Sequence, residues 1–165
     1  MAYLIGVGLA LAVSLFARFS RLDRERGFYP TVMMFIASYY GLFALMGGSL
    51  AALAMESVLI VVFILVALLG FKTNLWLVVA ALFAHGVYDF FHGHLIANPG
   101  VPAWWPAFCM TYDVTAAGYL AWLLRNTAAG PRKYPPKAFP PVCRGVSWIR
   151  WLFARNSCRP FPSPG

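Results

Sequence analysis

Charged residues are scarce in this chain, and the acidic ones are the scarcest: only 11% of its 165 residues are charged, with 5 acidic and 13 basic side chains. An ordinary soluble domain is about 25% charged and about 45–50% apolar, whereas 61% of this sequence is hydrophobic. On a water-soluble domain this composition would expose large aggregating patches. Intrinsic disorder is excluded as well, because it requires low hydrophobicity and high charge. The composition therefore predicts a membrane protein.

Cysteine is rare too, and the 3 cysteines do not have the spacing of a zinc motif. The 14 Gly and 12 Pro residues show no three-residue repeat, which excludes a collagen-like fibre. No basic residue precedes the first apolar stretch, and no small-residue cleavage site follows it. We therefore interpret this stretch as a retained span and not as a cleaved signal peptide.

Long apolar runs are what the sequence has in abundance. A helix needs about 20 apolar residues to cross about 30 Å of hydrocarbon. Five runs approach or reach this length, of which the first is the shortest: 2–17, 29–46, 49–71, 75–92 and 104–124. A glycine pair between the second and third runs predicts a tight antiparallel hairpin there. We therefore predict an all-α fold, a polytopic bundle of five transmembrane helices over residues 1–125.

The basic residues predict the orientation of this bundle. Cytoplasmic loops collect Lys and Arg, whereas short translocated loops exclude them. With the N-terminus outside, all 13 basic residues fall on the inner side, in 18–28, 72–74 and the segment after Leu124. The net charge of +8 is thus an orientation signal and does not predict nucleic-acid binding. We expect a multi-pass protein of the bacterial inner membrane, with the lipid bilayer as its main partner.

The C-terminal segment, residues 126–165, differs from the rest in composition. It holds eight prolines and seven basic residues but no acidic one, which predicts a basic, proline-rich cytoplasmic tail and not a second domain. Two interpretations remain for residues 146–156 within it. They form either a short amphipathic helix, with Arg150 and Arg155 at anionic lipid headgroups, or an apolar patch in a mostly disordered tail.

The predicted spans contain ionisable side chains, which cost about 2.5–3.5 kcal/mol each when charged at the bilayer centre. They are Glu56, His85, Asp89, His92, Cys109 and Asp113. At about 100° per residue, His85, Asp89 and His92 form one narrow stripe along a helix. The topology places all six side chains in the outer half of the membrane. We therefore predict one site in the outer leaflet, formed by His85, Asp89, His92, Asp113 and Glu56.

Three further residues are secondary candidates for this site: His94, Cys109 and Tyr112. His94 points to the opposite side of its helix from the stripe, so we expect it at the rim. Cys109 and Asp113 share a face of the last span because they are four residues apart. We interpret Tyr39 and Tyr40 as packing aromatics and not as ligands.

Three functions are open for the predicted site. The stripe supplies two imidazoles and a carboxylate, and Asp113 or Glu56 could complete a zinc or iron site. In an enzyme, this metal would activate a water molecule that hydrolyses an ester or amide of an outer-leaflet lipid. The site could instead relay protons or gate a small solute, because histidine changes charge near neutral pH. The third interpretation is a polar network that only fixes helix register. Interhelical hydrogen bonds average about 0.6 kcal/mol, which is little stabilisation for so many costly buried groups.

Several segments between residues 18 and 125 carry a recognisable pattern. They are 26–32, 36–40, Glu56, 85–94, 101–109 and 112–113. Together they resemble a family of small bacterial integral-membrane proteins, which implies an inner-membrane location but no particular chemistry; the proline-rich tail is not part of the pattern. The His and Asp residues on adjacent spans are also similar, more loosely, to the intramembrane metal-dependent lipid hydrolases of the ceramidase and progestin-receptor type.

Overall fold

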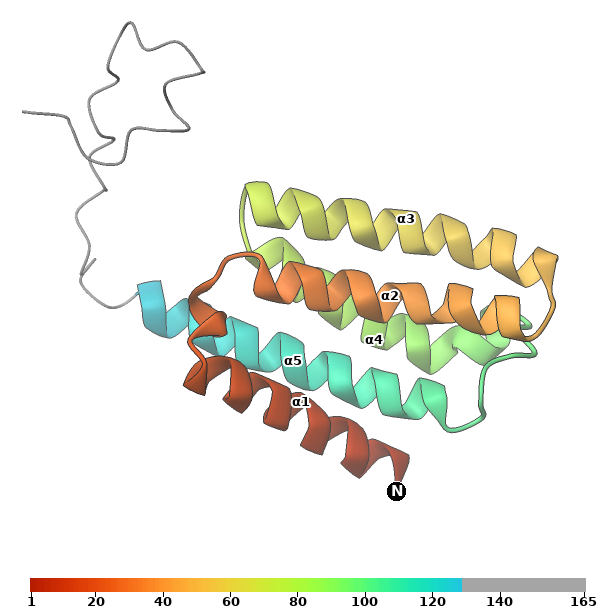
Figure 1. Cartoon of the computed structure of the whole chain (residues 1–165), viewed down its shortest axis with the longest axis horizontal. Helices are drawn as coiled ribbons and strands as arrows, with labels where there is room; N and C mark the ends of the chain where they lie inside the picture. Colours follow the sequence, from red (N-terminus) through yellow and green to blue (C-terminus); the bar gives the residue numbers. More distant parts are fainter. Residues whose placement is uncertain (129–165) are drawn as a thin grey trace, which may run out of the picture. The chain divides into compact units, whose positions relative to one another are not determined.

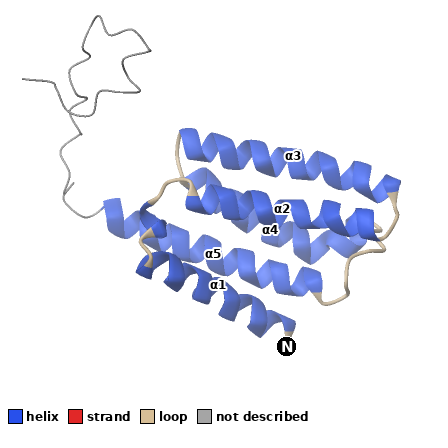
Figure 2. Ribbon diagram, in the orientation of Figure 1, coloured by secondary structure: helices blue, strands red, loops and turns tan. Residues whose placement is uncertain are grey.

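The computed structural model describes residues 1–128 of the chain, and all regular structure in this range is helical (Figures 1 and 2). The elements are α1 (Ala2–Phe19), the 3-10 turn η1 (Leu22–Arg24), α2 (Phe28–Met46), α3 (Leu50–Lys72), α4 (Trp76–Leu95) and α5 (Trp105–Ala128). The prediction of an all-α fold with five helices is confirmed. The predicted tail and its segment 146–156 lie outside the described residues, apart from the last turn of α5.

The helix ends differ from the predicted ones by a few residues. α1 is 18 residues long and ends at Phe19, beyond the predicted end at Ala17. Arg18 extends it because arginine is a good helix former and its charge favours a helix C-terminus. α4 continues past His92 to Leu95, and the Ile96 N–H closes it by donating to the His92 carbonyl at 2.9 Å. The length of an apolar run thus underestimates the length of a helix whose last turn is polar.

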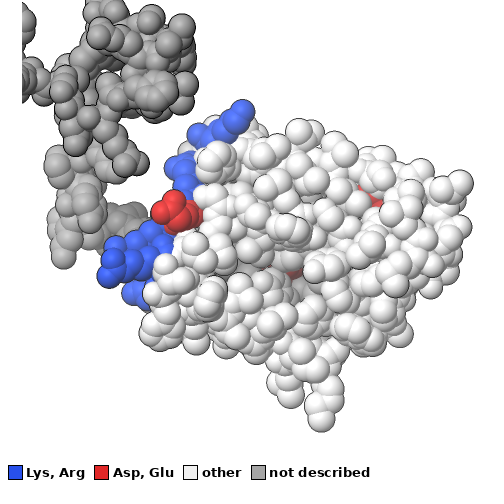
Figure 3. Space-filling model, viewed as in Figure 1, with Lys and Arg blue, Asp and Glu red and all other residues white. Residues whose placement is uncertain are grey.

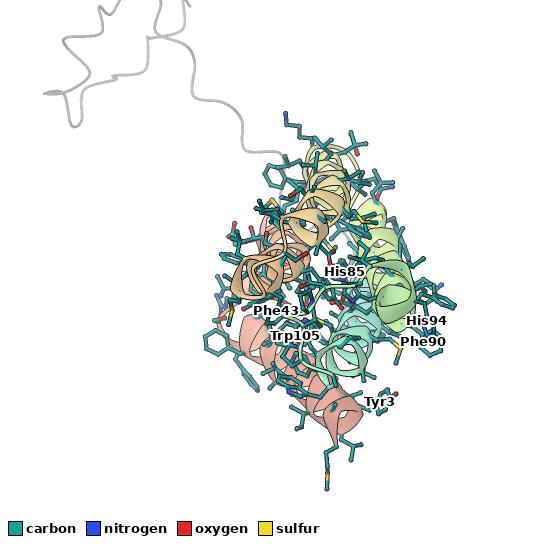
Figure 4. The ribbon with its side chains drawn as sticks, turned by 90° about the vertical axis from the view of Figure 1, so that its right-hand side faces the viewer. Tyr3, Phe43, His85, Phe90, His94 and Trp105 are labelled. Atoms are coloured by element: carbon teal, nitrogen blue, oxygen red, sulfur yellow. The ribbon has the colours of Figure 1, made fainter. Side chains whose placement is uncertain are left out.

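Each helix packs mainly against its neighbours in space, which are not always its neighbours in sequence. α1 packs on α5, α5 on α4, α4 on α3, and α3 on α2, while α2 also contacts α4 (Figure 1). α1 approaches α5 closely because its buried residues are small, and a side chain at Gly6 would overlap the Phe108 carbonyl oxygen. The interior between α2, α4 and α5 receives His85 (Figure 4).

The connections hold the helix ends together. Gly48 takes a left-handed conformation (φ 67°) between α2 and α3, and the Ser49 side chain accepts from Ala52 N at 3.2 Å to cap α3. The predicted hairpin is therefore confirmed. At the other end of α3, the Arg26 guanidinium donates to the Thr73 carbonyl oxygen at 2.6 Å. A cation at this position also compensates the partial negative charge of the helix C-terminus.

Basic side chains gather at one end of the bundle (Figure 3). In residues 1–128 they are Arg18, Arg21, Arg24, Arg26, Lys72 and Arg125. They lie where α1, α3 and α5 end and where α2 and α4 begin. The acidic residues Asp23 and Glu25 belong to the same end, and Arg18 Nη1 lies 3.5 Å from Asp23 Oδ2.

By length and composition, three helices of the described range could cross a membrane: α1, α2 and α3. Large apolar side chains are exposed on all three, among them Leu4, Phe35 and Val58. An exposed apolar surface of this kind suits contact with lipid. These helices support membrane association of the chain.

Candidate functional site

Three of the predicted residues meet in the interior of the bundle: His85 and Asp89 from α4, and Asp113 from α5. His85 Nδ1 lies 2.7 Å from Asp113 Oδ2 and 3.4 Å from Asp89 Oδ2. All three residues are at most 1% exposed, and Figure 4 shows His85 between the helices. We refer to these three residues as the His85 cluster.

The local sequence explains how these residues come together. His85 and Asp89 are four residues apart, so they lie on one face of α4. Gly86 brings α5 close to this face, because a β-carbon there would lie only 3.2 Å from the Met110 carbonyl oxygen and 3.4 Å from the Asp113 β-carbon. A larger residue at position 86 would push Asp113 away from the imidazole.

The His85 cluster is incompletely hydrogen-bonded. Tyr40 donates its hydroxyl to Asp89 Oδ1 at 2.7 Å. Asp89 Oδ2 and Asp113 Oδ1 are buried and find no hydrogen-bond partner within residues 1–128. One donor atom from each of His85, Asp89 and Asp113 lies within 4.8 Å of the others. Zinc binds nitrogen and oxygen donors at about 2.0–2.2 Å, so small side-chain rotations would let these atoms share one ion.

The second group is centred on Glu56 of α3, which is 1% exposed. Its Oε1 lies 2.7 Å from His92 Nε2 and accepts from Asn98 Nδ2 at 3.1 Å, while its Oε2 accepts from the Tyr88 hydroxyl at 2.8 Å. We refer to Glu56, Tyr88, His92 and Asn98 as the Glu56 cluster. Both oxygens of its carboxylate are partnered, so it forms a closed network between α3, α4 and the following connection.

Tyr40 of α2 touches both clusters. Its ring stacks on His92 with centroids 4.0 Å apart and an interplanar angle of 16°, its hydroxyl binds Asp89, and its carbonyl oxygen accepts from Asn98 Nδ2 at 3.1 Å. Tyr40 therefore packs through its ring, as predicted, and also forms a buried hydrogen bond to Asp89 that the sequence did not predict. The neighbouring Tyr39 does pack, with its ring 5.1 Å from that of Trp105.

The predicted single site is thus divided into two adjoining clusters, because Glu56 pairs with His92 and not with His85. The secondary candidate His94 is exposed and points away from the interior (Figure 4), as the sequence predicts for its side of α4. Cys109 and Tyr112 are buried on α5. Cys109 lies one turn before Asp113, and Tyr112 lies one residue before it. They line a different cavity, described below.

The sequence prediction did not include three residues of these clusters: Tyr40, Tyr88 and Asn98. Tyr88 lies three residues after His85 and four before His92, so helical spacing alone could have placed it on the polar stripe. Asn98 belongs to the connection between α4 and α5, and no periodicity applies there. It also lines a cavity of about 640 Å³ beneath this connection, together with His92.

Comparison with known proteins identifies no relative. No protein family, curated protein or solved structure matches the chain. The function of the two clusters is therefore inferred from their geometry and chemistry.

Proposed function

We propose that this chain is an integral protein of the bacterial inner membrane that binds one divalent metal ion at His85, Asp89 and Asp113. The observation that carries this proposal is the pair of buried carboxylate oxygens, Asp89 Oδ2 and Asp113 Oδ1, without a hydrogen-bond partner in residues 1–128. Two ionised carboxylates exceed the positive charge that one imidazole can supply. All Lys and Arg side chains of this range belong to the basic end of the bundle. A divalent cation would supply the missing charge.

The donor set favours zinc or iron. Imidazole nitrogen is a typical ligand of both zinc and iron, and carboxylate oxygens bind both metals as well. Three protein ligands leave at least one coordination position open, which is typical of catalytic and not of structural zinc sites. A metal ion in this position would polarise a carbonyl group or activate a water molecule.

The proposed topology has five spans, with the N-terminus and the α2–α3 hairpin outside. The clustering of Arg18, Arg26, Lys72 and Arg125 with the other basic residues at one end supports it, because that end is then cytoplasmic. Asp89 follows the start of α4 by 13 residues, or about 20 Å of helix. Both clusters would then lie in the outer half of the bilayer.

The metal content of the purified full-length chain tests the proposed site. We expect about one zinc or iron per chain in detergent, measured by mass spectrometry of the metal after exposure to each ion and removal of excess. Asp113→Asn and His85→Ala should lose the metal, whereas His94→Ala should keep it because His94 is exposed. Wild-type protein that binds neither ion, or equal binding in all variants, would overturn the proposal. Metal-free protein whose stability depends on pH would favour proton handling instead.

Labelling of introduced cysteines tests the topology. In a chain whose three native cysteines are replaced by alanine, Ala97→Cys and Thr73→Cys each place one exposed thiol at one of the two ends of the bundle. A membrane-impermeant maleimide added to intact spheroplasts should label position 97 and should label position 73 only after lysis. The opposite pattern would reverse the proposed orientation.

The Glu56 cluster has a different role in this proposal. Its carboxylate is matched by one imidazole and by hydrogen bonds to both oxygens. This complete pairing favours a structural function, in which the cluster holds α3, α4 and the connection after α4 in register.

A further inference from the structure

An apolar groove of about 680 Å³ lies between α1, α2 and α5. It exists because α1 packs on α5, whereas α2 packs on α3 and α4. The edges are formed by exposed side chains, including Leu9 of α1 and Phe35 of α2, which are 45% and 68% exposed. The floor is formed by Ile36, Cys109 and Tyr112, which are at most 9% exposed. The groove therefore opens sideways, through the outer surface of the bundle.

The surroundings of the opening determine what can enter it. The opening lies between α1 and α2, two helices that are long and apolar enough to cross a membrane. In the proposed topology it faces the acyl chains of the outer leaflet. On α5 the groove runs from Trp105 to Tyr112, which is about 10 Å along the helix. It therefore begins at the outer interface and descends into the hydrocarbon.

The lining of the groove contains no Asp, Glu, Lys or Arg, which disfavours a charged, water-soluble ligand. Trp105 lines the groove, but its Nε1 is buried out of contact with the open space of the groove. Tryptophan rings are enriched at membrane interfaces, where their apolar body meets lipid. The complementary ligand is an apolar chain, such as the acyl chain of a phospholipid in the surrounding leaflet.

We infer that this groove binds one acyl chain of an outer-leaflet phospholipid. The inference rests on the proposed membrane insertion but not on the proposed metal ion. Cys109 belongs to the floor and lies one helical turn before Asp113, on the same face of α5. The floor of the groove therefore lies one helical turn from Asp113 of the His85 cluster.

Photo-crosslinking tests the groove. The full-length chain is reconstituted into vesicles of phosphatidylethanolamine and phosphatidylglycerol, with a phosphatidylglycerol that carries a diazirine in one acyl chain. We expect crosslinks to Ile36, Cys109 and Tyr112 at least about tenfold above those to exposed Val58 of α3, which corresponds to a binding preference of about 1.4 kcal/mol. Equal crosslinking of floor and outer surface would overturn the inference.

A matched pair of variants locates the binding site. Leu9→Trp fills the groove from its edge, and Leu65→Trp places the same side chain on exposed α3. We expect floor crosslinks to fall about tenfold in the first variant and to stay unchanged in the second. Equal yields in Leu9→Trp and Leu65→Trp would contradict the inference.

The same samples separate this inference from the metal proposal. Asp113→Asn should lose the metal and keep the floor crosslinks, whereas Leu9→Trp should lose the crosslinks and keep the metal. Wild-type protein that binds metal but shows no preferential floor crosslinks would overturn the lipid site. Wild-type protein that shows these crosslinks but binds no metal would overturn the metal site. Release of the wild-type chain from membranes by alkaline carbonate would overturn membrane insertion, and the lipid site with it.

Discussion

The Glu56 cluster and the His85 cluster adjoin each other inside one helix bundle, yet they differ in charge balance and in hydrogen bonding. In the Glu56 cluster one carboxylate faces one imidazole, and both of its oxygens have partners. In the His85 cluster two carboxylates face one imidazole, and within residues 1–128 two oxygens have no hydrogen-bond partner. Glu56 and His92 are at most 2% exposed, as buried as the three residues of the His85 cluster, so the burial of these ionisable groups does not explain the difference.

The comparison shows that two groups of buried ionisable residues can differ in how completely their charges and hydrogen bonds are matched. A balanced, fully bonded cluster can contribute to stability through its internal pairing, and its removal leaves its partners uncompensated. An unbalanced cluster whose oxygens lack hydrogen-bond partners is costly in isolation, and a bound cation would offset this cost. The two clusters should therefore respond differently to the same kind of substitution.

Glu56→Gln should give the largest loss of stability, because it leaves His92 without its charge partner. We expect a decrease of about 3–5 kcal/mol in the free energy of unfolding, as for other broken buried pairs, measured by denaturation in detergent. Glu25→Gln removes the same charge from an exposed position at the basic end and should change stability by less than about 0.5 kcal/mol. Equal effects would mean that the Glu56 cluster contributes no specific stability.

Removal of metal should lower the stability of the protein only through the His85 cluster. Wild-type protein with zinc at about 100 times its Kd should be stabilised by about 2.7 kcal/mol relative to chelated protein, as seen from thermal unfolding with and without EDTA. Asp113→Asn should show no such difference. A chelation effect of equal size in both proteins would indicate that the metal binds elsewhere.

Tyr40→Phe tests the residue that links the clusters. It removes the hydrogen bond to Asp89 but keeps the ring that stacks on His92. We expect a loss of about 1.5 kcal/mol in stability, the lower range for hydrogen bonds to charged groups. Tyr39→Phe is the control, because Tyr39 packs on Trp105 through its ring. A Tyr40→Phe protein as stable as the Tyr39→Phe protein would contradict the role of this hydroxyl.

His94→Ala should have the smallest effect, although His94 is only two residues from His92. Its side chain is exposed, so stability should change by less than about 0.5 kcal/mol. His92→Ala in the same assay should be far more harmful, because it leaves the buried Glu56 carboxylate unpaired. Similar unfolding curves for the two variants would remove the distinction between the polar face and the outer face of α4.

Much of the fold could be predicted from the sequence because it depends on local properties. The length of each apolar run indicates a helix, and the glycine pair at 47–48 indicates a turn. The stripe of His85, Asp89 and His92 follows from helical periodicity. The predicted ends of α1 and α4 were less accurate, since polar residues such as Arg18 can continue a helix after its apolar run has ended.

The pairing of the buried side chains could not be predicted in the same way. Asn98 reaches Glu56 from a connection that has no periodicity, and Tyr40 joins both clusters from a helix whose sequence is almost wholly apolar. Spacing along one helix does not specify how far another helix is rotated or shifted against it. The groove beside α5 likewise depends on the separation of α1 from α2.

The sequence by itself determined that the described chain forms apolar helices and which face of α4 carries the polar side chains, because both follow from residue order within one segment. The tertiary structure decided that Glu56 pairs with His92 while Asp113 joins His85 and Asp89. The physical reason is that these contacts require the close approach of α5 at Gly86 and the position of α3 against α4. Contacts of this kind are set by packing between helices, which no single segment encodes.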